Sequence, residues 1–145
     1  MKTHLKIEQF MTRYPIVTSR TTSIQEAFSL IRKKGIRHLP VVDAQGQLVG
    51  LISDRDIKIA ISLEGAERMT VEDLMISNTY FVENTASLHD VASSMAEKRL
   101  GCVPVLEKGQ LVGIFTTEDA LRSLSELVHS LPRQAVSDTS KKIAS

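Results

Sequence analysis

The chain contains the same phrase twice, and this internal repeat constrains its fold more than any other feature. LVGLISDRDI begins at Leu48 and LVGIFTTEDA begins at Leu111, and both copies place a Ser or Thr three residues before an Asp. A shift of 64 residues also superposes Met11 on Met75, and after the loss of one residue in a turn the shift becomes 63. Repeats of this length indicate structural units that bury their apolar faces against one another. The sequence therefore predicts two similar units.

Each unit alternates strand-like and helix-like segments. In the first unit, PIVTS predicts a short strand, and Ser23 with Glu26 forms a capping box for a helix that ends at Gly35. HLPVVD and LVGLIS predict a hairpin, a second helix begins at Asp54, and the second unit repeats this order. We therefore expect an α/β (α+β) fold of two pseudo-symmetric β-α-β-β-α units. The expected boundaries are 5–62 for unit 1, 63–70 for a connection, 71–128 for unit 2 and 129–145 for a polar tail.

The composition excludes several classes of protein. An apolar fraction of 42% with 24% charged residues is typical of globular proteins. The sequence has no apolar run long enough for a membrane helix and no leader pattern at its N-terminus, so we expect a cytoplasmic protein. A net charge of +1 makes nucleic acid an unexpected partner. The single cysteine, Cys102, cannot form an internal disulfide, and the four histidines lack metal-ligand spacing, so no metal is expected.

Residues 5–124 resemble a tandem pair of cystathionine-β-synthase (CBS) domains, often called a Bateman module. IRHLPVVDAQGQLVGLISDRDI, which begins at Ile36, is especially similar to free-standing bacterial CBS pairs, including acetoin-utilisation proteins. The resemblance implies two units that pack their sheets together into a disc, with two equivalent clefts that commonly hold AMP, ADP, ATP or S-adenosylmethionine. It also implies a ligand-sensing regulatory module that is not an enzyme and requires no cofactor. The alternative is a scaffold or adaptor that binds no ligand and acts through its helical faces.

The repeated Ser/Thr-x-x-Asp has two interpretations. Ser53 and Thr116 can cap helices, with Asp56 and Asp119 completing capping boxes. The resemblance implies that the two carboxylates also contact the ribose hydroxyls of an adenosine ligand, with Ser53 and Thr116 beside them. A carboxylate has about four acceptor positions, so capping and ligand binding are compatible.

Cationic side chains near the second strand are candidates for phosphate contacts. The resemblance indicates Arg37 and His38 for this role, with Arg55 as a third group; the alternative is a solvated basic face. The second unit has Gly101 in place of Arg37 and Glu118 in place of Arg55. The resemblance implies that a cleft can take its Asp from one unit and its phosphate contacts from the other, so Arg37 and His38 are not assigned to one ligand. We still expect the Asp56 cleft to accept a phosphorylated ligand better than the Asp119 cleft, where Glu118 would repel phosphate. For the purine the resemblance indicates residues that could equally belong to the core: Ile16, Val17, Thr18, Ile36, Phe81, Val82 and Leu100.

His38 and Cys102 occupy equivalent positions in the repeat, which makes a base and nucleophile pair the enzymatic alternative. We disfavour it because a cysteine at the start of a strand is commonly a small buried apolar residue. We expect no catalytic residue in this chain.

The charge is divided unevenly along the chain. Residues 1–63 hold ten Lys and Arg against five Asp and Glu, and residues 64–124 hold five against ten. The resemblance implies a homodimer formed through the rim helices. Because complementary charges attract, we expect a head-to-tail dimer, in which the basic unit of one chain meets the acidic unit of the other. The protein target and the regulated pathway are not identified by the sequence.

Overall fold

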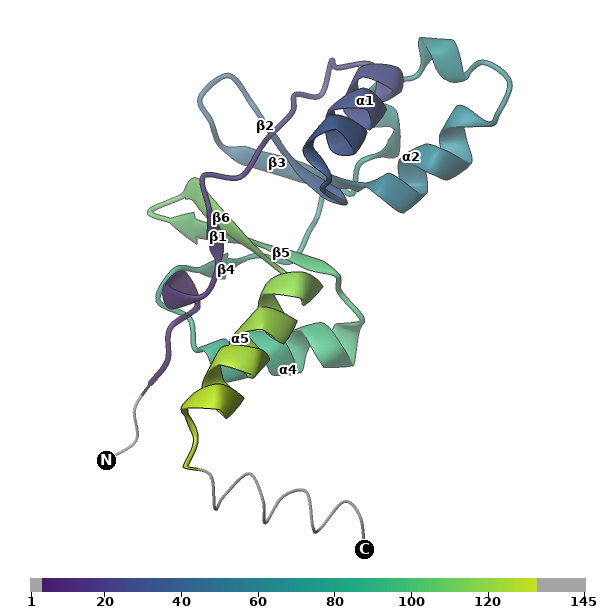
Figure 1. Ribbon diagram of the computed structural model, residues 1–145. Coiled ribbons are helices and arrows are strands. Elements are labelled where there is room, and N and C mark those ends of the chain that lie inside the picture. The colour runs from purple at the N-terminus through teal and green to yellow at the C-terminus, as the bar shows by residue number, and fades with distance from the viewer. Residues whose placement is uncertain (1–3, 133–145) are drawn as a thin grey trace, which may run out of the picture.

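Two antiparallel hairpins form the centre of the molecule. β2 (His38–Val42) pairs with β3 (Leu48–Ser53), and β5 (Cys102–Glu107) pairs with β6 (Gln110–Thr116). The computed structural model describes residues 4–132 and places one hairpin above the other (Figure 1). The outer side of the first hairpin is covered by α1 (Ile24–Lys34) and α2 (Asp54–Ile61), and that of the second by α4 (Leu88–Lys98) and α5 (Thr117–Ser130). This arrangement confirms the predicted mixed α/β fold.

The helices begin at the predicted caps. Ser23 Oγ accepts a hydrogen bond from the Glu26 backbone N–H at 3.1 Å, and α1 ends at Gly35 with a φ of 63°. A residue with a Cβ would adopt this left-handed conformation only at a cost in conformational free energy, which favours glycine here. A reciprocal capping box between Thr70 and Asp73 opens the short helix α3 (Val71–Leu74). Two 3-10 helices, Ile7–Gln9 and Ala66–Arg68, complete the helical elements of the described residues.

The prediction that PIVTS, residues 15–19, forms a regular strand is wrong. Tyr14 has a φ of 52° and Pro15 has no backbone N–H, so the chain bends there and cannot continue an ordinary ladder. The segment makes one isolated parallel bridge, between Thr18 and Val41. The second unit does contain the equivalent strand, β4 (Val82–Glu83), which pairs parallel with β5.

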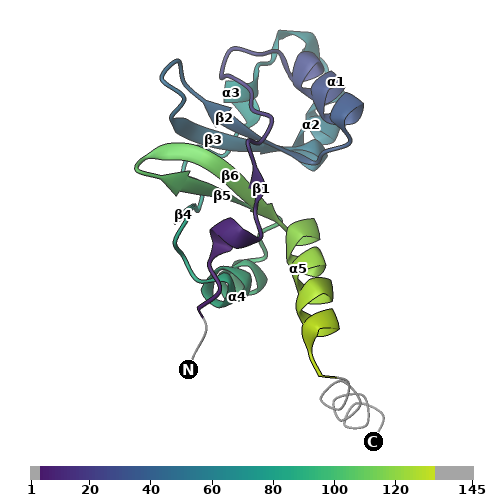
Figure 2. The same cartoon turned by 60° about the vertical axis from the view of Figure 1, so that its left-hand side comes forward.

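The N-terminal segment of each repeat packs on the hairpin of the other repeat. β1 (Thr12–Arg13) belongs to the first repeat but pairs with β6, so the second sheet has the order β1-β6-β5-β4 (Figure 2). In return, Ile76 bridges Leu51 of the first sheet, with the Leu51 N–H donating to Ile76 O at 3.0 Å. The buried side chains follow the same exchange. Ile7 and Met11 pack with Val91, Val103, Val105 and Phe115, whereas Val71 packs with Ile31, Leu39, Ile52 and Ile57.

The glycine of each LVG phrase lies where an exchanged segment crosses the hairpin. A Cβ on Gly113 would lie 2.9 Å from the carbonyl oxygen of Thr12 and 2.5 Å from Sδ of Met11. A Cβ on Gly50 would lie 3.0 Å from the carbonyl oxygen of Ile76. The repeated glycine therefore has a packing reason, because no other residue allows the crossing backbone to approach so closely.

Within residues 4–132, none of the helices has both the length and the apolar composition needed to span a bilayer. Helix α5 continues to Ser130, two residues into the predicted tail. The rest of that predicted tail, from residue 133 onward, lies outside the described residues.

Candidate functional site

A cavity of about 350 Å³ lies between the two repeats, within the size range of small-molecule sites. Both repeats contribute to its wall. The residues that line it come from the end of α1 and the start of β2, from the edge formed by β1 and β6, and from the first turns of α5: Thr12, Gly35, Ile36, Arg37, His38, Gly101, Ile114, Thr116, Thr117, Glu118, Asp119 and Arg122.

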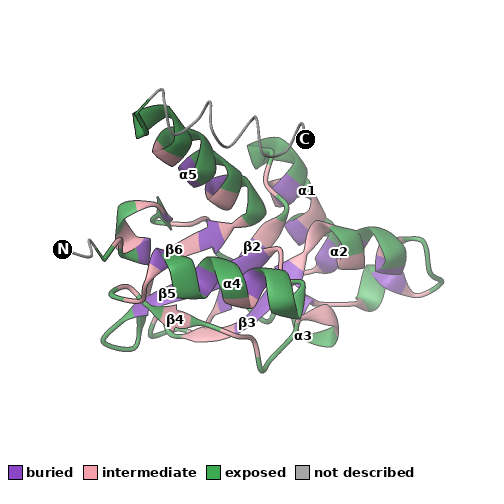
Figure 3. Cartoon of the chain, turned by 90° about the horizontal axis from the view of Figure 1, so that it is seen from below, coloured by how far each residue is buried: buried purple, intermediate pink, exposed green. Residues whose placement is uncertain are grey.

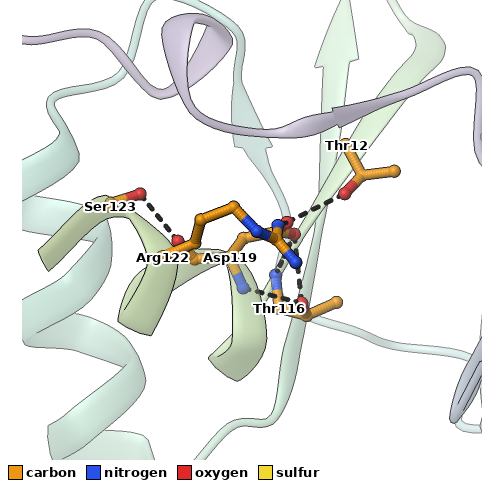
Figure 4. Close-up of polar contacts among 5 residues, drawn as sticks. All are labelled: Thr12, Thr116, Asp119, Arg122 and Ser123. Atoms are coloured by element: carbon orange, nitrogen blue, oxygen red, sulfur yellow. Dashed lines mark hydrogen bonds and ion pairs between the residues drawn. The ribbon is translucent and has the colours of Figure 1, made fainter. Parts of the chain in front are cut away.

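Asp119 is the most heavily hydrogen-bonded side chain of this cavity. Its Oδ2 accepts hydrogen bonds from the Thr116 N–H at 2.9 Å and from Thr116 Oγ1 at 3.0 Å, which completes the predicted capping box. Its Oδ1 accepts from Thr12 Oγ1 at 2.9 Å and from Arg122 Nη1 at 3.0 Å (Figure 4). These four donors match the acceptor capacity of a carboxylate, and Asp119 is only 3% exposed.

Asp56, the repeat counterpart of Asp119, lies in a different environment. The Asp56 N–H donates to Ser53 Oγ at 3.2 Å, so Ser53 caps α2 as predicted. Among the residues that the structure describes, however, no hydrogen bond reaches the Asp56 carboxylate. The sequence explains the difference, because the two donors to Asp119 have apolar counterparts near Asp56. Ile76 is the repeat counterpart of Thr12, and Ile59 is the repeat counterpart of Arg122. Asp56, Ser53 and Arg55 do not line the 350 Å³ cavity.

Arg37 and His38 line the cavity of Asp119, so they do not favour the Asp56 cleft for phosphate, whereas Glu118 lines the Asp119 cavity as expected. Each hairpin is closed at its open end by an equivalent bond: the Asp54 N–H donates to Arg37 O at 2.8 Å, and the Thr117 N–H donates to Gly101 O at 3.0 Å. A Cβ on Gly101 would lie 3.3 Å from His38 Cε1. Gly101 therefore leaves room for the imidazole, and Arg37 and His38 of the first repeat line the same cavity as Asp119 of the second.

The imidazole of His38 is partly buried, and this desolvation is the main reason that its pKa is lowered. The neighbouring Arg37 guanidinium lowers the pKa further, while Asp54, Asp56 and Glu118 oppose the shift. His38 is therefore neutral at pH 7 and offers the cavity one N–H donor and one nitrogen acceptor.

Acidification is expected to destabilise the wild type more than the His38→Gln variant. The folded state holds His38 at a lowered pKa, whereas an unfolded histidine titrates near its ordinary value of about 6.5. The His38 contribution is therefore fully present above pH 6.5 and is lost as the pH falls through the folded-state pKa. Thermal unfolding of both proteins between pH 7.5 and 5 measures this. An identical pH dependence in the two proteins would contradict the assignment.

Cys102 begins β5 and is buried, and burial raises the pKa of its thiol to about 12, with a further contribution from Asp119. The thiol therefore stays protonated at neutral pH, and it lacks the thiolate that a nucleophilic cysteine requires. Between residues 4 and 132 there is also no group of three or more His, Cys, Asp or Glu side chains that could hold a metal ion.

The structure brings together five of the predicted site residues: Ile36, Arg37, His38, Thr116 and Asp119. Val17, Thr18 and Val82 do not line this cavity, and Thr18 is buried. Sequence reasoning missed Arg122 and Thr12. The position of Arg122, three residues after Asp119 on the same helix face, is a signal that could have found it. Thr12 has no such signal, because it reaches the site only through the pairing of β1 with β6.

The family model of the CBS domain matches residues 7–63 and 71–126. Among curated proteins, the chain is 32% identical over 117 residues to the L-aspartate semialdehyde sulfurtransferase of Methanocaldococcus jannaschii, covering 80% of the chain but only 22% of that protein. It is 28% identical over 141 residues to a CBS domain-containing protein of Dictyostelium discoideum, covering 89% of the chain and 97% of that protein.

Three solved structures have the same fold. The AcuB protein of Vibrio cholerae superposes with a TM-score of 0.78 at 34% identity, covering 90% of this chain and all of that one (100%). CBSX2 in complex with AMP superposes with a TM-score of 0.76 at 28% identity, covering 84% and 97%. The CBS domain pair of protein MJ0100, in complex with 5′-methylthioadenosine and S-adenosyl-L-methionine, gives 0.78 at 30% identity, covering 86% and 98%. The chain therefore belongs to the CBS domain family and carries two CBS domains in tandem.

Proposed function

We propose that the protein is a regulatory module that binds an adenosine-containing nucleotide, such as AMP, ADP, ATP or S-adenosylmethionine, in the cleft of Asp119. The observation that carries this proposal is the cavity between the repeats, where a carboxylate and a guanidinium from different repeats face the same space. The complexes of CBSX2 with AMP and of MJ0100 with 5′-methylthioadenosine and S-adenosyl-L-methionine support the ligand class.

Each part of such a ligand has a suitable group in the cavity. Asp119 can accept hydrogen bonds from the ribose hydroxyls where these replace a protein donor. Phosphate suits the N-terminus of α5, a helix of 14 residues, and the guanidinium of Arg37 can bind it with two parallel hydrogen bonds. Ile36 and Ile114 offer apolar surface for the purine.

A ligand in this position would contact both repeats at once. Binding would therefore favour the conformations in which the repeats are held together, and a partner that distinguishes those conformations would respond to the ligand. We propose no catalytic step, since the buried Cys102 is a protonated thiol and the cavity presents no activated nucleophile. The cytoplasmic location stays a prediction.

Thermal unfolding with adenosine ligands tests the proposal. AMP, ADP, ATP, 5′-methylthioadenosine and S-adenosylmethionine are compared with GMP, which tests the base. A ligand at a hundredfold excess over its Kd adds about 2.7 kcal/mol to the free energy of unfolding, which raises the Tm by roughly 8 °C. Arg37→Ala should remove most of this shift for phosphorylated ligands. Arg55→Ala is the matched control, because Arg55 does not line the cavity, and it should retain the shift.

Two results would contradict the proposed site. The absence of a shift with every adenosine ligand would leave the scaffold function as the better account. An equal loss in Arg37→Ala and Arg55→Ala would move the ligand away from this cavity.

The exposed apolar residues on α5 support a protein contact as well. Leu121, Leu124 and Val128 recur at helical spacing on α5, Leu131 follows at the C-cap, and all four are 40–61% exposed. The outer side of α5 is largely exposed (Figure 3). We propose that this surface contributes to a homodimer, and the uneven charge favours the head-to-tail arrangement. Sedimentation as a monomer at micromolar concentration would contradict the dimer, and cross-links between the two first repeats would contradict its orientation. The same surface would serve the scaffold alternative.

A further inference from the structure

The hydrogen bonds on Asp119 differ in how easily a ligand could replace them. The Thr116 N–H and hydroxyl are fixed by the helix cap, and the Thr12 hydroxyl is carried by a strand that pairs with β6. Arg122 is different, because its side chain is 63% exposed while that of Asp119 is 4% exposed. Arg122 is thus the donor that can leave Asp119 without unfolding any backbone.

A ribose that binds Asp119 must take acceptor positions from protein donors. Oδ2 already accepts two hydrogen bonds from Thr116, so the accessible oxygen is Oδ1, which Arg122 and Thr12 share. The guanidinium that leaves Oδ1 is then free to bind a new anionic partner. An uncharged nucleoside supplies none, whereas a 5′-phosphate supplies oxygens that match the guanidinium fork.

The charges of the cavity point in the same direction. Arg37 shares the cavity with Glu118, which offsets its attraction for an anion. A released Arg122 would add a second guanidinium to the same cavity. The first repeat has no equivalent, since Ile59 stands at the position of Arg122.

We propose that Arg122 competes with ribose for Asp119 and, once displaced, binds the 5′-phosphate, so that the Asp119 cleft selects phosphorylated adenosine ligands over uncharged nucleosides. This inference rests on the proposed function and names the residue that determines its ligand class. Arg122 acts in two opposite ways, as a competitor of every adenosine ligand and as a partner of the phosphorylated ones.

Calorimetric titration of adenosine and AMP into the wild type, Arg122→Gln and Arg122→Lys separates these two effects. We expect the wild type to prefer AMP by at least about tenfold, the value of one charge-assisted contact. In Arg122→Gln, adenosine should bind about fivefold more tightly and AMP about fivefold more weakly, because the competitor and the phosphate partner are lost together. Arg122→Lys keeps the positive charge but lacks the planar guanidinium, so it should retain part of the preference for AMP that Arg122→Gln loses.

Lys58→Gln is the matched control. Lys58 forms an ion pair with Asp54 at 2.9 Å on α2, has a side chain that is 54% exposed, and does not line the cavity. This variant should bind both ligands as the wild type does.

The outcomes distinguish this inference from the proposed function. If the wild type binds both ligands but Arg122→Gln weakens both equally, or changes neither, the role of Arg122 is overturned while the ligand site stands. A wild type that prefers adenosine would also overturn it. If the wild type binds neither ligand, the proposed function and this inference fail together.

Discussion

Asp119→Ala is expected to lower the free energy of unfolding by about 3 kcal/mol, whereas Asp56→Ala is expected to lower it by less than about 0.5 kcal/mol. The two residues are equivalent in sequence, but only Asp119 is buried under four hydrogen bonds. Its removal leaves the Thr116 N–H without its capping acceptor and the Thr12 hydroxyl without its partner. In Asp56→Ala the backbone N–H of residue 56 can still donate a hydrogen bond to Ser53 Oγ, so the cap of α2 is kept.

Urea unfolding of the wild type and both variants measures this difference. The Asp119→Ala midpoint should fall clearly, with an unchanged slope, while the Asp56→Ala midpoint stays close to that of the wild type. Equal losses in the two variants would contradict the asymmetry of the two repeats.

Gly113→Ala is expected to destabilise the protein by at least about 2 kcal/mol, a large effect for one methyl group. The new Cβ would lie 2.9 Å from the carbonyl oxygen of Thr12, a backbone atom that can move only if β1 separates from β6. Its second contact, at 2.5 Å, is with Sδ of Met11, which is a flexible side chain. Urea unfolding provides the measurement here as well.

A double-mutant cycle tests the cause of that loss. Met11→Ala alone should destabilise the protein, because Met11 is buried in the core beside β5 and β6. Combined with Gly113→Ala it removes one of the two close contacts, so the pair should lose less free energy than the sum of the single variants. A simple sum would show that the crossing of β1 is not what requires the glycine.

The sequence predicted the local elements well, for reasons that lie within each repeat. Ser23 and Gly35 delimit α1 through contacts a few residues away, and both hairpins follow from β-branched segments around short turns. Such signals do not depend on which repeat packs against which. The mixed α/β fold and the family therefore followed from the sequence.

The arrangement between the repeats could not be predicted in the same way. A repeat makes pairing within a unit and pairing across units equivalent in sequence, so nothing indicated that β1 would pair with β6 or that Ile76 would bridge Leu51. The same ambiguity left Arg37 without an assignment to either cleft, and the structure shows that it lines the cavity of Asp119. Thr12 was missed for this reason too. Only the packed structure decides which copy supplies each wall of the cleft.

A crystal structure of the chain grown with AMP is the most direct test of the proposed nucleotide site at Asp119. AMP is expected in the 350 Å³ cavity between the repeats, with its ribose hydroxyls on Asp119 and its phosphate between Arg37 and Arg122. AMP bound beside Asp56 instead, or no bound AMP at millimolar concentration, would contradict it.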